Sequence, residues 1–225
     1  MLWAKLTFAQ RTKVRNLLEQ WIAQDIPGFE VLEKKQSLWM KILSKVLFFT
    51  PNFMDRFVTT FYPKVYIPSR GRWETNNYYS TTILLHEYVH LSDRQRLGLL
   101  FNFLYLSPQI LAVFALLYPV SPWFLLFLLA ALPIPSLGRT WAEVRGYRMS
   151  IATHYWLTGD KYNIDFVVNQ FVSSNYYWMF PFKGWIKGFF EREYEKIRRE
   201  ELSPELTKMR NLLTSYTHSV YNNLI

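Results

Sequence analysis

The longest uncharged segment of the chain, residues 97–138, constrains its fold more than any other feature. It contains no Asp, Glu, Lys, Arg or His in 42 consecutive positions, and residues 119–122 (Pro-Val-Ser-Pro) divide it into two apolar arms. Each arm approaches the roughly 20 residues that a helix needs to span a bilayer, although Pro108 interrupts the first arm and Pro133 and Pro135 shorten the second. The segment predicts a helical hairpin that either enters a membrane or is buried against protein.

Basic residues border this segment on both sides. Arg94 and Arg96 precede it, and Arg139, Arg145 and Arg148 follow it. Such flanks suit a hairpin that enters and leaves a membrane from the same face. The whole chain is basic, however, with 26 Lys and Arg against 17 Asp and Glu and a net charge of +9. The flanks therefore leave both alternatives open, and the charge favours an anionic phospholipid surface, nucleic acid or acidic protein as partner.

The remaining composition is that of a folded protein. Half of the residues are hydrophobic, which excludes intrinsic disorder as the main state. The mean hydropathy of −0.04 averages over the uncharged segment and a charged remainder. The chain has no cysteine, which excludes disulfide scaffolds, zinc fingers, iron–sulfur sites and cysteine catalysis. Any metal site must therefore be built from histidine and carboxylate ligands.

Hydrophobic periodicity predicts an α+β protein that is predominantly α. Helices are expected over residues 8–24, 31–49, 81–98, 140–157, 162–175, 184–201 and 204–217. Residues 57–68 are β-branched and aromatic and predict one or two short strands, with Val65–Ile67 near an edge of the sheet. We expect N-terminal amphipathic helices in residues 1–50, a core with the hairpin in residues 51–160, and an aromatic-rich helical region in residues 161–225, all in one structural unit.

Two features bear on localisation. The expected helix 31–49 is amphipathic and basic; its apolar stripe comprises Leu38, Trp39, Ile42, Leu43 and Val46, and Lys34, Lys35, Lys41 and Lys45 decorate the rest. Such a helix either lies on an anionic membrane or packs on the core with a solvated basic face. Residues 1–15 have no continuous apolar run and predict no secretory signal peptide. We expect the protein to associate with a membrane or with a larger assembly such as a virion.

The chemistry-bearing motif is His86-Glu87-Tyr88-Val89-His90, which holds two of the four histidines of the chain. It falls in the expected helix 81–98, for which Ser80 or Thr81 is the expected N-cap. Histidines at positions i and i+4 project from one helical face, so both imidazoles can reach a single metal ion. Glu87 lies beside that face and is the expected general base. The motif therefore predicts a zinc site that activates water.

A catalytic zinc ion usually has three protein ligands. Asp93 and Arg96 stand where an extended motif would need glycine and histidine, and Asp93 is expected in a supporting or capping role. The best third ligand is Glu143, the only carboxylate between Asp93 and Asp160. A hairpin over residues 97–138 would return the chain to its starting point and let Glu143 face the motif. The alternative is a surface Glu143 paired with a neighbouring arginine.

Three further residues are candidates for lesser roles. Tyr147 lies four residues after Glu143 and therefore on the same helical face, where its hydroxyl could donate to a developing oxyanion or simply pack. His154 is expected to be structural, with a role as proton donor as the alternative. His218 is not expected to take part.

His86-Glu87-x-x-His90 with Glu143 downstream resembles the zincin metallopeptidases of the gluzincin branch. Two apolar helices between the motif and the glutamate resemble the membrane-embedded zinc peptidases of the CAAX-processing and heat-shock type, which usually carry an acidic residue at the position of Tyr147. Residues 105–109 and 176–179 are also similar to small metallopeptidases encoded by bacteriophages. The resemblance covers roughly residues 57–157. It implies a zincin-like domain, Zn²⁺, a peptide substrate and an edge strand beside the active-site helix.

The sequence is compatible with three functions. The first is a zinc metalloendopeptidase with Glu87 as base, His86, His90 and Glu143 as ligands, and Tyr147 as oxyanion donor. The second is a non-enzymatic structural or docking component of a virion or membrane complex, with residues 97–138 and 176–190 as contact surfaces. The third is nucleic-acid binding, which is ranked last because the basic residues are scattered and no nucleic-acid motif is present.

Overall fold

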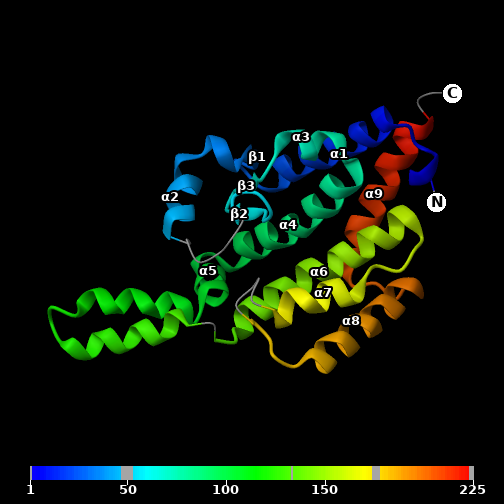
Figure 1. The fold of residues 1–225 in the computed structure, drawn as a ribbon. Coiled ribbons are helices and arrows are strands. Elements are labelled where there is room, and N and C mark those ends of the chain that lie inside the picture. Colours follow the sequence, from blue (N-terminus) through cyan, green and yellow to red (C-terminus); the bar gives the residue numbers. More distant parts are fainter. Residues whose placement is uncertain (1, 47–52, 133, 174–177, 223–225) are drawn as a thin grey trace.

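Helices dominate the fold, as predicted, and a small sheet lies at one side (Figure 1). The computed structural model describes residues 2–46, 53–132, 134–173 and 178–222. The α-helices are α1 (Phe8–Asp25), α2 (Leu38–Val46), α3 (Arg70–Thr75), α4 (Asn77–Leu97), α5 (Leu99–Leu106), α6 (Leu137–Thr158), α7 (Ile164–Val172), α8 (Lys183–Arg198) and α9 (Pro204–Asn222). The 3₁₀-helices are η1 (Trp3–Lys5), η2 (Lys34–Gln36), η3 (Gln109–Leu117) and η4 (Pro122–Ala131), and the strands are β1 (Glu30–Glu33), β2 (Thr59–Phe61) and β3 (Lys64–Ile67).

The three strands form one sheet in the order β1-β3-β2. β3 pairs in parallel with β1 and antiparallel with β2, so Val65–Ile67 lies in the central strand. The prediction that this segment lies near an edge is therefore wrong, because β1 covers its other side. Two side chains of β3, Val65 and Ile67, are fully buried. The two edge strands of the sheet are β1 and β2, and β2 contacts α4.

The expected helix 31–49 is wrong in its first half. Residues 30–33 form strand β1 and residues 34–36 form η2, so the helix begins only at Leu38; residues 47–49 lie outside the described part of the chain. Lys34 does not decorate a surface, because it is completely buried and its ammonium donates to the carbonyl oxygen of Phe53 at 2.8 Å. The predicted apolar stripe of α2 is exposed at Leu38, Trp39 and Ile42.

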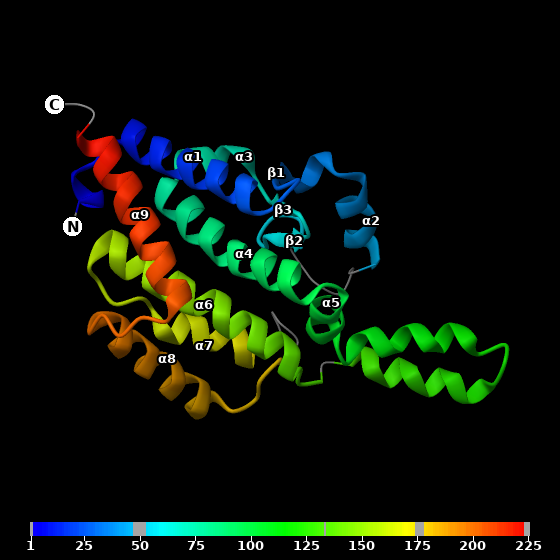
Figure 2. The ribbon, with the colours of Figure 1, turned by 180° about the vertical axis from the view of Figure 1, so that it is seen from behind.

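Helices α4 and α6 pack side by side at the centre of the fold (Figures 1 and 2). α4 begins four residues earlier than expected, because Asn76 is the N-cap and its side chain accepts a hydrogen bond from the amide of Tyr79. Gly98 ends α4 with a φ of +59°, a backbone conformation that favours glycine. The common hydrophobic core draws buried side chains from all three expected regions, from Trp3 near one end to Val220 near the other.

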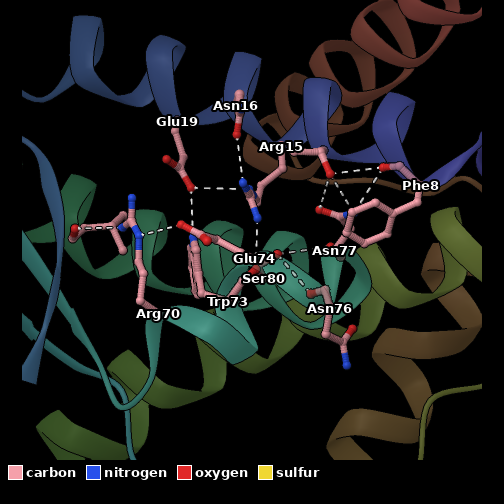
Figure 3. A network of polar contacts seen from close by, with 12 residues as sticks. Phe8, Arg15, Asn16, Glu19, Arg70, Trp73, Glu74, Asn76, Asn77 and Ser80 are labelled. Atoms are coloured by element: carbon pink, nitrogen blue, oxygen red, sulfur yellow. Dashed lines mark hydrogen bonds and ion pairs between the residues drawn. The ribbon is translucent and has the colours of Figure 1, made fainter.

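A polar network joins α1 to the start of α4 (Figure 3). Arg15 of α1 is buried, donates to the carbonyl oxygen of Trp73 at 2.9 Å and lies 3.6 Å from Glu19. The indole of Trp73 donates to the same glutamate at 3.0 Å. Asn77, in the first turn of α4, donates to Thr12 at 3.0 Å. Because most polar atoms of this network are paired, with Nε of Arg15 lacking a hydrogen-bond partner in the described part of the chain, the network adds geometric specificity to the packing of α1 on α4.

The uncharged segment folds into α5, η3 and η4, and the last two project from the body as an antiparallel pair (Figures 1 and 2). The hairpin is thus present, but its arms are shorter than predicted. Among the described residues no single helix is long and apolar enough to cross a membrane; α5 and η3 reach that length only together, and they meet at 92°. The base of the hairpin closes where the Ser136 hydroxyl donates to the carbonyl oxygen of Ser107.

Candidate metal centre

Three buried side chains from α4 and α6 converge on one point. His86, His90 and Glu143 each offer a ligand atom, and these atoms all lie within 4.8 Å of one another. The Nε2 atoms of the two histidines are 3.1 Å apart. The Glu143 carboxylate lies 3.6 Å from Nε2 of His86 and 3.9 Å from Nε2 of His90. The structure therefore brings together the three residues that the sequence nominated as a ligand set.

The spacing of these atoms fits a metal ion. Two ligands of a tetrahedral zinc ion, each about 2.1 Å from the metal, lie about 3.4 Å from one another. The three measured separations, 3.1, 3.6 and 3.9 Å, bracket that value. Contacts of 3.6 and 3.9 Å are too long for hydrogen bonds, so these donor atoms face one another without being directly bonded. A buried group of this kind can bind a metal ion.

Not every buried polar atom of the His86, His90 and Glu143 group has a hydrogen-bond partner within the described part of the chain. Among the described residues, Oε2 of Glu143 has no hydrogen-bond partner although it is buried. Burial opposes the charge of this carboxylate, but the imidazoles of His86 and His90 and the hydroxyl of Tyr105 lower the pKa of Glu143 to about 2. Glu143 is therefore an anion at neutral pH. A buried anion requires a cation or several donors, and a metal ion between Glu143 and the histidines meets that requirement.

The two imidazoles differ in their surroundings. Nδ1 of His86 lies 2.9 Å from the Ser150 hydroxyl, a contact that orients the ring so that Nε2 faces Glu143; metal-bound histidines usually have such a partner. Burial by itself would lower the pKa of His86, but its contact with Glu143 and the charge of Glu87 raise it. Burial lowers the pKa of His90 and keeps this imidazole neutral, as metal coordination requires.

Close packing of α6 on α4 depends on a glycine inside α6. A Cβ atom at Gly146 would lie 2.6 Å from Nε2 of His86 and 2.7 Å from Cε1. Glycine in the middle of a helix costs about 1 kcal/mol relative to alanine. That cost is offset here because only glycine lets the backbone of α6 approach the ligand imidazole.

We expect the substitution Gly146→Ala to weaken metal binding by at least about tenfold, because the new methyl group displaces the His86 ring that Ser150 orients. Isothermal titration with zinc measures the change. Gly184→Ala is the matched control, since a Cβ atom there meets no atom within 4 Å. Equal zinc affinity in both variants would contradict the role assigned to Gly146.

Sequence reasoning missed Tyr105 as a site residue. Its hydroxyl donates to Oε1 of Glu143 at 2.6 Å, and its ring packs against that of His90 with the centroids 6.1 Å apart. Tyr105 lies on α5, just before the hairpin. This stretch is apolar, and the resemblance noted for residues 105–109 assigned no role to the tyrosine side chain. A lone tyrosine there would not have been separated from the core aromatics without the tertiary contact.

The expected base, Glu87, is buried beside the ligand set. Its Oε2 accepts a hydrogen bond of 2.5 Å from the hydroxyl of Thr60. Thr60 lies on β2, so an edge strand runs next to the motif, as the zincin resemblance implies, although it is β2 and not residues 65–67. Burial lowers the pKa of Lys34 to about 7, against the opposing charges of Glu87 and Asp55. Thr60 and Lys34 are further site neighbours that the sequence did not reveal.

The remaining candidates lie outside the ligand set. Asp93 does not ligate; both of its carboxylate oxygens accept hydrogen bonds from Arg145, at 2.8 and 3.0 Å. The ring of Tyr147 packs edge-on against His86 with the centroids 5.0 Å apart. His154 is hydrogen-bonded to Tyr78 at 2.6 Å, in agreement with a structural role. His218 lines a cavity with Leu2 and Trp3 and does not belong to the metal-binding group.

The comparisons with known proteins add no relative. No protein-family model matches the chain, and no curated protein and no solved structure is significantly similar to it. The assignment of the site therefore rests on the converging geometry of His86, His90 and Glu143.

Proposed function

We propose that this protein is a zinc-dependent metallopeptidase. The observation that carries the proposal is the convergence of His86, His90 and Glu143 with Glu87 adjacent to them. Two histidines and one glutamate form a ligand set that catalytic zinc uses with water at the fourth position. The i, i+4 spacing of the histidines, with glutamate directly after the first, favours zinc and hydrolysis over other metals and reactions.

The mechanism assigns roles to Glu87, Thr60, Tyr105 and Tyr147. Bound zinc would polarise the scissile carbonyl and lower the pKa of a water molecule to about 7. Glu87 accepts a proton from the attacking water and later donates it to the departing amine nitrogen as the C–N bond breaks. Thr60 holds one oxygen of Glu87 and leaves the other for that proton. Tyr105 fixes the carboxylate of Glu143, and Tyr147 is proposed as the oxyanion donor.

The sheet supports a peptide as substrate. β2 is an edge strand, and Thr60 in its centre touches Glu87. An extended peptide that adds to such an edge is held by main-chain hydrogen bonds, which do not depend on its sequence. A substrate bound along β2 would therefore pass directly beside the general base.

We expect the purified protein to bind one zinc ion per chain, and Glu143→Gln to weaken that binding by about 100-fold or more, because it removes the anionic ligand. Affinity should fall as the pH decreases, since the raised pKa of His86 lets protons compete with the metal. Elemental analysis and competitive titration measure both effects. Glu74→Gln, which changes an exposed carboxylate on α3, is the control. Unchanged zinc binding in Glu143→Gln would sink the ligand assignment.

A non-enzymatic structural or docking role in a virion or membrane complex is the second candidate. It is favoured by the large apolar side chains that the protein exposes on η3 and η4 and, within residues 178–190, at Trp178, Phe182 and Trp185. In that case the metal would hold α4 to α6 without catalysis. A protein that binds zinc but hydrolyses no peptide in a diverse library would favour this role over the peptidase.

A further inference from the structure

The apolar hairpin, defined as η3, η4 and the turn between them (residues 109–131), is solvent-exposed over most of its surface. It projects from the body and touches it only at its base (Figures 1 and 2). Ala115 is the only buried residue of η3, and η4 has none. Exposed large side chains include Val113, Phe114, Leu116, Leu117, Tyr118, Val120, Trp123, Leu125, Leu126, Phe127, Leu128 and Leu129. An apolar surface of this extent marks an interaction site.

The distribution of these side chains identifies the kind of partner. Residues 125–129 of η4 are five consecutive exposed large hydrophobic residues, and with three residues per turn they point in every direction around the helix. Between residues 109 and 131 no side chain is charged. A partner that covers one face of a helix leaves the other face polar, whereas a helix that is apolar on all sides is enclosed by protein or by a membrane. The hydrocarbon of a lipid bilayer contacts all faces of an inserted helix at once. The all-round apolar surface of η4 therefore fits a lipid environment.

The turn of the hairpin is also suited to an apolar medium. Pro119 and Pro122 have no amide hydrogen. The amides of Tyr118, Val120 and Ser121 donate to carbonyl oxygens of Ala115 and Leu117, at 3.1, 2.9 and 3.4 Å. Unpaired backbone donors are expensive in hydrocarbon. This turn presents few of them at its tip.

Basic and aromatic side chains gather on the same side of the body as the hairpin. Helix α2 lies there (Figures 1 and 2), with Leu38, Trp39 and Ile42 exposed beside Lys41 and Lys45. Tryptophan and lysine in this combination are characteristic of helices that lie at the headgroup level of anionic membranes. Leu38, Trp39 and Ile42 of α2 are exposed in the protein, and a membrane surface would cover them.

We propose that the apolar hairpin enters, without crossing, the hydrocarbon core of an anionic phospholipid membrane, with α2 lying on the surface of that membrane. A 3₁₀-helix rises about 2 Å per residue, so each arm is about 20 Å long and is too short to cross a hydrocarbon core of about 30 Å. The hairpin enters and leaves from the same side. Tyr105 of α5 holds Glu143, so the candidate metal centre lies close to the membrane. A peptidase at this place would act on membrane-proximal peptides. Only this last consequence rests on the proposed function.

The absence of cysteine from the chain makes a site-specific test possible. Val120→Cys places a single fluorescent label at the exposed turn, and Ser215→Cys places one on the exposed surface of α9 as the control. The full chain is mixed with vesicles of equal parts phosphatidylcholine and phosphatidylglycerol. We expect a blue shift and higher emission for the label at residue 120, with quenching by lipids that carry a spin label on the acyl chain. The label at residue 215 should remain accessible to an aqueous quencher.

Introducing a charged residue into the apolar hairpin provides a second test. Leu116 and Leu129 are exposed in the protein, so aspartate at either position does not disturb the core, and circular dichroism verifies the fold. Each substitution is expected to reduce vesicle binding in flotation assays by about 100-fold. Phe8→Asp, at an exposed position of α1, is the matched control and should float like the unchanged protein.

Three results would overturn the membrane proposal. These are a label at residue 120 that stays accessible to water, aspartate variants that float normally, or a hairpin that forms a dimer by light scattering without binding vesicles. Because these measurements use vesicle binding alone, they can be repeated with Glu87→Gln protein. Failure of the membrane proposal is thereby separated from failure of the peptidase proposal.

Discussion

Replacing Glu87 with glutamine is expected to lower the proposed peptide hydrolysis by a factor of about 10²–10⁴ while leaving the proposed zinc binding intact. Glutamine has the same shape, and its carbonyl oxygen can still accept the hydrogen bond that Thr60 donates to Glu87. The amide cannot take a proton from water, however, and the loss of a general base typically costs a factor of about 10²–10⁴ in rate. The catalytic efficiency towards a library of fluorescence-quenched peptides measures the loss, and elemental analysis measures the zinc content.

Catalytic efficiency and zinc content, measured together, distinguish a catalytic role of Glu87 from a structural one. If Glu87→Gln lost zinc and activity in parallel, Glu87 would be a residue that positions the ligands. Full activity in the variant would refute the assignment of the base. Glu74→Gln, which alters a carboxylate exposed on α3, controls for the general effect of removing one negative charge.

Replacing Arg145 with leucine is expected to lower the free energy of unfolding by about 3–5 kcal/mol, because it leaves a buried carboxylate without its partner. Asp93 is only 2% exposed, and Arg145 donates to both of its oxygens. The same guanidinium donates to Glu205 of α9 at 3.0 Å. Arg145 thus joins α4, α6 and α9 at one point. Urea denaturation followed by circular dichroism measures the loss.

A double-mutant cycle separates the ion pair from simple loss of packing. We expect the double variant Arg145→Leu with Asp93→Leu to recover much of the stability, because the buried charge is then absent. Arg198→Leu is the matched control, since its ion pair with Glu195 is exposed and exposed pairs contribute at most about 1 kcal/mol. Equal destabilisation by Arg145→Leu and Arg198→Leu would contradict the importance assigned to the buried pair.

The relative positions of residues that lie close together in the sequence were predictable. His86 and His90 share a face because α4 is helical, and the i, i+4 spacing decides this without any tertiary contact. Glu143 could be nominated because the uncharged segment closes as a hairpin and no other carboxylate lies between Asp93 and Asp160.

Residues that meet only through packing were not predictable. Tyr105 reaches Glu143 across 38 positions, and Thr60 reaches Glu87 across 27. Neither residue stands in a motif. Lysine is usually found on protein surfaces, yet the pairing of β1 with β3 carries the chain after Glu33 into the interior, where Lys34 is buried. Strand β1 was missed because its four residues also fit a helical pattern, and the partner strand lies more than thirty residues away.

The sequence by itself determined the shared face of His86 and His90, the predominantly helical class and the uncharged segment, because each depends on spacing or composition within a short stretch. It nominated Glu143 as a candidate, which the tertiary structure brings to the two histidines. Only the tertiary structure decided that Gly146 admits His86, that Tyr105 and Ser150 hold the ligands, and that the hairpin projects from the body. The physical reason is that these features follow from how α4, α5 and α6 pack. Packing is specified by the complementary shapes of distant side chains, for which a single sequence has no local signal.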